Sequence, residues 1–229
     1  MRRRFLKGLF GTMAEGALWT LESLDMGRVL DGSYPELQRI VIGVDPSGCS
    51  GPEDERSDEV GIVVVGLGVD GRAYVLEDLS GRFGPGGEQG WGKIVGSAFD
   101  RHGADCVVAE TNFGGEMVHE VIRAARPRTP FKKVTASRGK VVRAEPISVL
   151  YGTEEAVGKV SHVGIFPKLE DQLCGFTTSG YVGDRSPDRA DALIWALAEL
   201  FPVLAKPEKK KAAEVSRAQE YHSPHGWMG

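Results

Sequence analysis

The sequence predicts an α/β fold in which helices flank a mixed central sheet and the first three strands are antiparallel neighbours. Two observations support this prediction. Three apolar, β-branched runs follow one another at residues 39–45, 60–69 and 72–79, as is typical of buried strands. Further along the chain, segments with helical spacing alternate with short apolar runs, as in proteins whose helices cover a sheet.

The composition is that of an ordinary soluble globular protein. The chain has 229 residues, of which 41% are hydrophobic and 26% charged, and this is enough for one sizeable domain. Its formal net charge of -4 does not by itself favour nucleic-acid binding, although acidic residues gathered in one site count against the net charge. No apolar run reaches the roughly 18 residues that span a bilayer, so no membrane partner is expected. Three scattered cysteines fit neither a disulfide framework nor a zinc site, which favours a reducing cytoplasm.

The limits of the first three strands are predicted from the turn-forming residues that follow or separate them. The run at residues 39–45 ends in Asp45 and is closed by Pro-Ser-Gly. Asp70-Gly71 separates the second and third runs, and an Asp-Gly pair between strands is a hairpin signal. Residues 1–38 have no strong period and end in a turn-rich stretch, so they are predicted to be an N-terminal extension or linker.

Helices and strands alternate in the rest of the chain. In order, the patterns predict a helix at 91–102 with Gly103 as its C-cap, a strand at 105–110, a helix at 115–125, a strand at 131–135, a helix at 144–151 with Pro146 in its first turn, a hairpin or short strands at 157–165, and a short helix at 169–174. The last helix, at 188–200, is strongly amphipathic, with Ser186 as its N-cap and Pro187 as its first residue. The domain is therefore predicted to span residues 39–204, followed by a polar, disordered tail at 205–229.

Acidic residues mark the ends of two strands and the start of the last helix. Asp45 and Glu110 each end a strand at its carboxyl side, the edge at which open α/β sheets bind ligands. Asp188 and Asp191 are three residues apart, so they share one helix face. Magnesium prefers a few carboxylates plus water and substrate phosphate, and two such ions can activate water and stabilise the leaving oxygen of a phosphodiester. The four acids therefore predict a divalent-metal site for phosphodiester hydrolysis.

Each acid also has an ordinary structural explanation. An aspartate before Pro-Ser-Gly, such as Asp45, is a common turn former. Asp188 and Asp191 would favour the N-terminus of a helix electrostatically without binding any metal. The order of the elements is more specific than any one acid, because an acid ends the first strand, another ends a later strand, and the final helix begins with two.

Several segments together resemble the C-terminal nuclease domain of the large terminase subunits of tailed phages and gene transfer agents. These segments are IVIGVDPSG, DEVGIVVVG, VVAETNFGG, SPDRADALIWAL and the stretch from Ala136 to Leu173. The resemblance implies an RNase H-like fold and cleavage of double-stranded DNA with Mg²⁺ or Mn²⁺, in a two-ion arrangement. It implies Asp45, Glu110 and Asp191 as catalytic metal ligands, and Asp188 as a further metal ligand. It also implies a terminase ATPase domain, a small terminase subunit and a portal protein as partners, in the host-cell cytoplasm.

A basic stretch lies between Arg123 and Arg143, where eight Lys or Arg residues occur in an otherwise acidic protein. The resemblance puts part of it near the active-site face, so contacts with DNA phosphates are expected from Lys132, Lys133, Arg138, Lys140 and Arg143. A solvated loop is the alternative explanation. Lys159, His162 and Lys168 are weaker candidates, and the Trp195 face of the last helix is expected to be core packing.

Two other functions remain open from the residues alone. One is a junction resolvase or transposase-type nuclease of the same fold, and the other is a packaging module that binds DNA or the portal without cutting. ATP hydrolysis is not expected, because no G-x-x-x-x-G-K-[ST] string occurs and the nearest, at residues 152–160, has the wrong spacing. On this interpretation, residues 1–38 are the remnant of a junction to an ATPase.

Overall fold

A six-stranded mixed sheet forms the centre of the molecule in the computed structural model, which describes residues 15–46, 59–111, 116–137, 139–153, 156 and 158–202. The strand order is β5-β4-β1-β2-β3-β6. The strands are β1 (Leu37–Asp45), β2 (Gly61–Gly68), β3 (Ala73–Asp78), β4 (Cys106–Glu110), β5 (Phe131–Val134) and β6 (Val160–His162). β1, β2 and β3 pair antiparallel, whereas β4 joins β1, β5 joins β4 and β6 joins β3 in parallel. The predicted mixed sheet with three antiparallel leading strands is confirmed.

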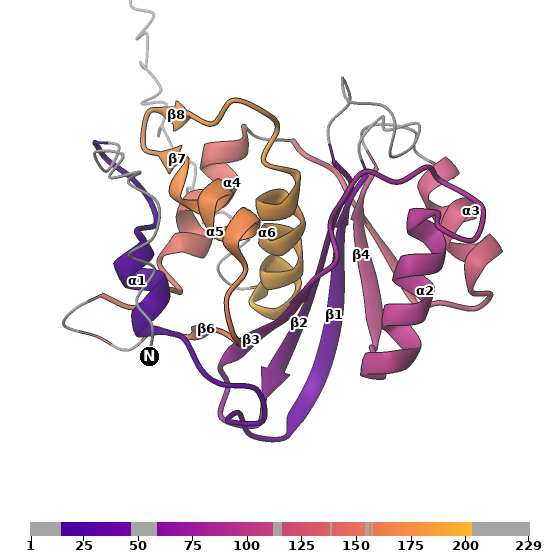
Figure 1. The fold of residues 1–229 in the computed structure, drawn as a ribbon, viewed down its shortest axis with the longest axis horizontal. Helices are drawn as coiled ribbons and strands as arrows, with labels where there is room; N and C mark the ends of the chain where they lie inside the picture. The colour runs from indigo at the N-terminus through magenta and orange to yellow at the C-terminus, as the bar shows by residue number, and fades with distance from the viewer. Residues whose placement is uncertain are drawn as a thin grey trace, which may run out of the picture.

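Helices cover both faces of this sheet (Figure 1). α2 (Trp91–His102) and α3 (Glu116–Ala125) lie on one side, and α4 (Lys140–Ser148), α5 (Pro167–Cys174) and α6 (Asp188–Leu200) lie on the other. α1 (Leu21–Met26) and a small hairpin of β7 (Phe176–Thr177) and β8 (Gly180–Tyr181) complete the second side. No helix among the described residues is long and apolar enough to cross a bilayer.

The two faces follow from the alternation of side chains along each strand. Val41 belongs to the core under α6, whereas Ile42 and Val44 belong to the core under α2 and α3. In β4, Val108 belongs to the first core and its neighbours Val107 and Ala109 to the second. Because successive side chains in a strand point to opposite faces, one apolar run supplies both cores.

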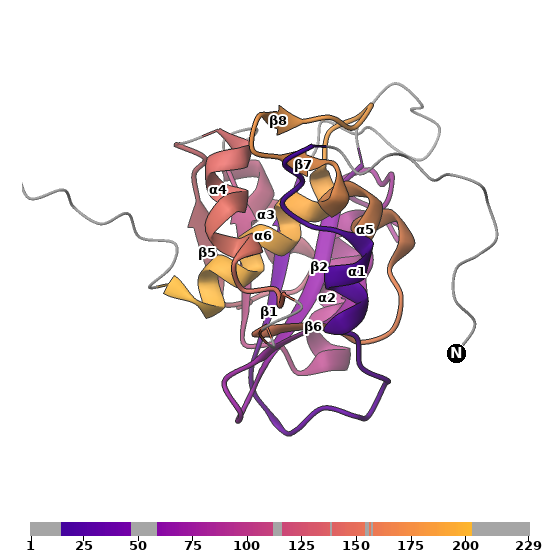
Figure 2. The same ribbon diagram turned by 90° about the vertical axis from the view of Figure 1, so that its left-hand side faces the viewer.

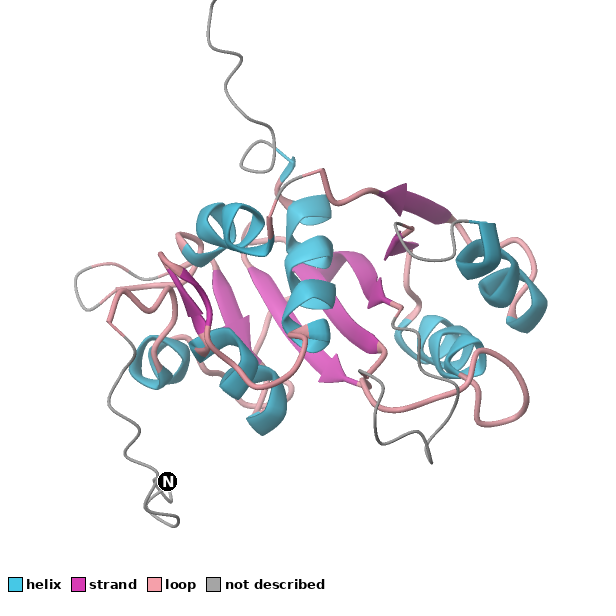
Figure 3. Cartoon of the chain, turned by 90° about the horizontal axis from the view of Figure 1, so that it is seen from above, coloured by secondary structure: helices cyan, strands magenta, loops and turns pink. Residues whose placement is uncertain are grey.

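α6 lies directly against the backbone of β1 and β2, and Figure 3 shows it crossing over the strands. A Cβ atom at Gly43 would be 2.0 Å from the carbonyl oxygen of Ala192, and one at Gly61 would be 1.9 Å from that of Asp188. Neither distance is possible for a real side chain, so only glycine permits this contact. The two glycines therefore set how closely the start of α6 approaches the sheet.

α4 begins earlier than its sequence pattern predicts. The predicted helix at 144–151 is in fact Lys140–Ser148, with Gly139 at the N-cap and Pro146 inside the helix instead of in its first turn. The prediction was wrong because it used the proline to place the start, and proline is usually found at that position. The correction has a functional consequence, since Lys140 and Arg143 now occupy the first helical turn and share one face.

The start of α6 also differs from its prediction. The helix begins at Asp188, and Pro187 is its N-cap residue. The side chain of Pro187 makes no capping hydrogen bond to the helix. Ser186, the predicted N-cap, instead accepts a hydrogen bond from Lys140 Nζ at 2.9 Å. A tertiary contact between α4 and the segment before α6 has therefore replaced the local cap.

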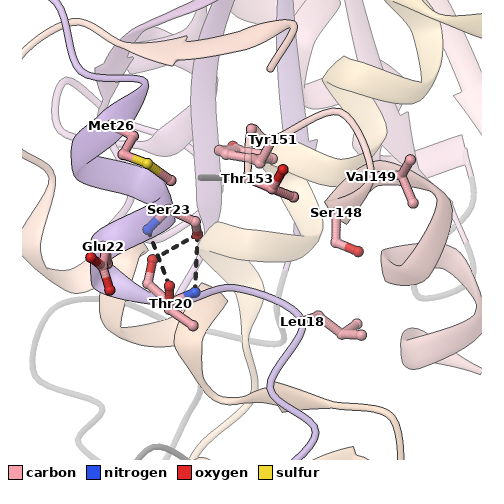
Figure 4. Close-up of a pocket in the computed structure, with 10 residues that line it drawn as sticks. Leu18, Thr20, Glu22, Ser23, Met26, Ser148, Val149, Tyr151 and Thr153 are labelled. Atoms are coloured by element: carbon pink, nitrogen blue, oxygen red, sulfur yellow. Dashed lines mark hydrogen bonds between the residues drawn. The ribbon is translucent and has the colours of Figure 1, made fainter. Parts of the chain in front are cut away.

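The segment before β1 packs into the same core as the sheet. Thr20 and Ser23 form a reciprocal capping box at the start of α1, and the side chains of Trp19 and Leu24 are buried. Figure 2 shows α1 alongside α5, with which it is in contact. A cavity of about 460 Å³ lies between α1 and the end of α4, with Met26 and Val149 among its lining residues (Figure 4). The predicted domain boundaries at residues 39 and 204 remain predictions. The whole tail at 205–229 lies outside the described residues, as does Arg138.

A buried polar network fastens this segment to α5. Arg28 Nη1 donates to Glu170 Oε1 at 2.7 Å, and the Glu170 side chain is fully buried. His162 Nδ1 is 3.3 Å from the same oxygen, and its Nε2 is 3.1 Å from the Tyr151 hydroxyl. His162 is therefore enclosed in the core, and the suggestion that it contacts DNA is wrong.

We expect Gly61→Ala to destabilise the fold, because the added Cβ would collide with the α6 backbone and overpacking costs about 1–3 kcal/mol or more. Urea unfolding measures the free energy of unfolding. Gly86→Ala is the matched control, since a Cβ there meets no atom within 4 Å. Equal stability of the two variants would contradict the close approach of α6.

We expect stability to fall on acidification through the Glu170 network. Burial alone would raise the pKa of Glu170, but hydrogen bonds from His162, Arg28 and the Phe166 backbone lower it to about 2. An unfolded glutamate has a pKa of about 4.3, so this contribution is complete above that pH and is lost as the pH falls towards 2. Burial also lowers the pKa of His162, so protonation of the unfolded chain below about pH 6.5 acts in the same direction.

Urea unfolding of the wild type and of Glu170→Gln between pH 7 and pH 2.5 tests this expectation. The variant should be less stable at pH 7 and should lose roughly 2 kcal/mol less between pH 4.5 and pH 2.5. Parallel pH profiles for the two proteins would contradict the assignment.

Candidate functional site

Asp45 and Glu110 lie level with each other at the ends of two neighbouring parallel strands. Val44 of β1 pairs with Ala109 of β4, so the next residues of the two strands, Asp45 and Glu110, occupy the same level. Alternation puts both side chains on the face that carries Gly43 and Val108, which is the face covered by α6. The strand ends therefore present two carboxylates towards the same helix.

The first turn of α6 brings two more carboxylates to this place. Asp188 and Asp191 are both buried, and α6 touches the sheet at Gly61, the residue paired with Asp45 across β1 and β2. The pKa of Asp45 lies well above its usual range because of burial, with further increases from the charges of Asp191, Asp188 and Glu110. The structure thus brings together all four acids that the sequence singled out.

Two cations of α4 lie against these acids. Lys140 Nζ is 2.7 Å from Asp191 Oδ2, and Arg143 Nη2 is 2.9 Å from Asp191 Oδ1 and 3.8 Å from Glu110 Oε2. Lys140 also lowers the pKa of Asp45 through its charge, although burial and the other acids outweigh it. Arg143 thus lies between Glu110 and Asp191, and both oxygens of Asp191 face a positive charge.

Trp195 has a polar role that its sequence position did not suggest. Its indole N–H donates to Glu110 Oε2 at 2.9 Å, and the Arg143 guanidinium carbon is 4.9 Å from the centre of its ring. The expected core packing is confirmed, because Trp195 packs against the core under α6, but its partly buried indole also contacts an acid of the site. The sequence contains one signal for a place near the site. Trp195 is four residues after Asp191, so the two side chains lie on the same face of the helix.

The donor set fits a hard divalent cation. Four carboxylates from two strands and one helix are the oxygen ligands that Mg²⁺, Mn²⁺ and Ca²⁺ prefer, and their mutual repulsion favours a cation between them. Within the described residues, however, no three acidic, His or Cys side chains are already arranged to hold an ion. Among these acids, Arg143 lies between Glu110 and Asp191, and Lys140 pairs with the other oxygen of Asp191.

The predicted DNA-contact residues fall into two groups. Lys140 and Arg143 lie at the acids, whereas Lys132 and Lys133 project from β5 and form ion pairs with Glu199 and Glu116 respectively. Arg138 lies outside the described residues. The predicted contact residues therefore do not lie on one continuous loop, since Lys132 and Lys133 belong to β5 and Lys140 and Arg143 to the first turn of α4.

Arg189 is a buried residue of this region that sequence reasoning missed. Its Nε donates to Glu59 Oε2 at 2.6 Å and its Nη1 to Asp78 Oδ2 at 2.7 Å. These contacts join α6 to β3 and to Glu59, two residues before β2. Arg189 directly follows Asp188, so its ion pairs hold the same helical turn that carries the acids.

The fold is the RNase H-like nuclease fold. The chain belongs to the family of the terminase RNase H-like domain, whose family model matches residues 42–200. It is similar to the nuclease domain of the large terminase subunit of bacterial virus Sf6, with 14% identity and a TM-score of 0.56, over 79% of this chain and 98% of that one. No curated protein sequence matches the chain.

A second similar structure is the large terminase nuclease of the thermophilic phage G20c with bound cobalt. Its identity is 18% and its TM-score 0.55, over 81% of this chain and 98% of that one. A variant of the Sf6 domain with manganese gives 13% identity and a TM-score of 0.54, over 79% and 98% of the two chains. At these identities the similarity establishes the shared fold.

We expect Asp45→Asn to stabilise the metal-free protein, because it removes one charge from a buried acidic cluster that already raises the pKa of Asp45. The melting temperature in EDTA at pH 8 should rise by about 2–4 °C, which corresponds to roughly 1 kcal/mol in a protein of this size. Asp31→Asn, at an exposed residue away from the site, is the control and should leave the melting temperature unchanged. A lower melting temperature for Asp45→Asn would show that the carboxylate stabilises the metal-free fold.

Proposed function

We propose that this chain is a divalent-metal-dependent endonuclease that cuts double-stranded DNA during packaging of a phage or gene transfer agent genome. The observation that carries the proposal is the convergence of four carboxylates from β1, β4 and α6 on one place beside two cations. Membership of the terminase RNase H-like family supports the nuclease role and the packaging context.

Asp45, Glu110 and Asp191 would hold Mg²⁺ or Mn²⁺, with Asp188 as a further ligand and two ions as the proposed number. Such ions, when bound, lower the pKa of a water molecule and stabilise the oxygen that leaves phosphorus. The residues around the acids would hold these metal ligands in position. Trp195 orients Glu110 through its N–H, and the glycine contacts under α6 set the height of the two aspartates. The manganese and cobalt in the related structures are consistent with divalent-metal use.

Lys140 and Arg143 have a second role in this proposal. Divalent ions held by the acids would weaken the ion pairs of Lys140 and Arg143 with Asp191, and the phosphates of DNA would offer both side chains a new partner at the same place. Lys132, Lys133 and Arg138 would extend these phosphate contacts along the duplex. Such contacts hold DNA without reading its sequence.

The proposed partners follow from the family. They are double-stranded DNA, a terminase ATPase domain, a small terminase subunit and a portal protein, in the cytoplasm of the host cell. The related Sf6 domain is part of a large terminase subunit, which supports an ATPase neighbour for this chain.

We expect Asp45→Asn to abolish cleavage of a linear duplex in Mg²⁺ or Mn²⁺, because it removes a ligand charge while leaving the fold intact. A gel assay with plasmid or linear DNA measures cleavage, and circular dichroism checks the fold. Asp31→Asn is the matched control and should cut as well as the wild type. Full activity of Asp45→Asn would rule out the proposed site.

The same assay separates the other functions. A four-way junction offered beside the linear duplex should not be preferred, and strong preference for the junction would indicate a resolvase. A wild-type chain that binds duplex DNA but never cuts it in either metal would indicate a packaging module without nuclease activity.

A further inference from the structure

The first turn of α6 carries two of the proposed metal ligands but has no cap from its own sequence. Pro187 occupies the cap position and has no side chain that could accept a hydrogen bond. The hydroxyl of Ser186 accepts from Lys140. The first N–H groups of a helix have no acceptor within the helix. At the start of α6 these groups therefore need an acceptor from another part of the chain.

Gln172 of α5 supplies the acceptor. Its Oε1 accepts hydrogen bonds from the backbone N–H groups of Arg189 and Ala190, at 2.9 and 3.1 Å. Its Nε2 is 3.5 Å from the carbonyl oxygen of Ser186, just before the helix. One amide side chain therefore contacts the chain on both sides of the helix start, and the two N–H groups lie between Asp188 and Asp191 in sequence.

The helix α5, which carries the Gln172 amide, is held in place by buried contacts. Leu169 and Leu173, on either side of Gln172, are fully buried. Glu170, two residues before it, is held by Arg28, by His162 and by the Phe166 backbone. Gln172 thus projects from a helix that is fixed by both apolar and ionic contacts.

We propose that Gln172 is a positioning residue for the metal site. By capping two N–H groups of α6, it sets the position of Asp188 and Asp191 relative to the acids of the strands. This inference rests on the proposed function, since it assumes that these acids bind a divalent ion. The cap acts on the backbone between the two ligands, so its loss allows the first turn to fray and to move both carboxylates. A neutral amide is suited to this task, because it caps the helix without adding a fifth negative charge to the cluster.

Two variants of Gln172 separate capping from packing. Gln172→Met keeps the length of the side chain but removes the oxygen acceptor, whereas Gln172→Glu keeps an acceptor oxygen. Thr20→Ala is the matched control, because it deletes the side-chain cap of α1, far from the acids in sequence. A merely structural role for Gln172 would make Gln172→Met behave like Thr20→Ala.

Mn²⁺ binding to the full chain, measured by isothermal titration calorimetry without DNA, is the first readout. We expect Gln172→Met to weaken binding by about tenfold or more, as is usual for residues that orient metal ligands. Gln172→Glu should bind at least as tightly as the wild type, and Thr20→Ala should bind within about twofold of it. Hydrogen exchange is the second readout, and the Arg189 and Ala190 amides should lose protection only in Gln172→Met.

Unchanged Mn²⁺ affinity of Gln172→Met, or an equal loss in Thr20→Ala, would overturn the positioning role and leave the proposed nuclease standing. Unchanged exchange of the two amides in Gln172→Met would also overturn it. If the wild type bound no Mn²⁺, or if Asp45→Asn bound it equally well, the proposed metal site itself would fail. The two failures are therefore distinguishable.

Discussion

The contact between the α6 backbone and two glycines of the sheet is the constraint on which the rest of the site depends. At Gly43 and Gly61 the helix approaches so closely that no Cβ fits, and Gly61 pairs with Asp45. The parallel register of β1 and β4 brings Glu110 level with Asp45. The position of the helix and the register of the strands together bring four acids to one place, and neither would do so alone.

The surroundings of the acids have opposing effects. Burial and mutual repulsion make the acidic cluster unfavourable, while Lys140 and Arg143 offset part of that cost through short ion pairs with Asp191. Trp195 contacts both an acid and a cation of the site, because its N–H donates to Glu110 and its ring lies beside the Arg143 guanidinium. On the far side of α6, Arg189 pairs with Glu59 and Asp78, so the first turn of the helix is held from two directions.

The sheet and the acids could be predicted from the sequence because local patterns determine them. Apolar β-branched runs marked the strands, and Asp45 and Glu110 stood where two of those runs ended. The start of α4, the cap of α6 and the hydrogen bond of Trp195 could not be predicted, because each depends on residues distant in the chain. Lys140 meets Ser186 and Gln172 meets Arg189 only after α4, α5 and α6 have packed together. The short strands β7 and β8 were missed because two residues are too few to show a period.

The ion pairs of α4 also bear on the balance of charge in the site. Lys140 and Arg143 offset two of the four carboxylates, so in the proposed site a single divalent ion would complete electrical neutrality while both side chains stay in place. A second ion would exceed that balance unless Lys140 and Arg143 withdrew or negative charge arrived from outside the site. A phosphodiester brings such charge, and it also offers the withdrawn cations a partner. In the proposed metal site, the number of bound ions would thus be linked to the presence of substrate, so the free and DNA-bound forms need not hold the same number.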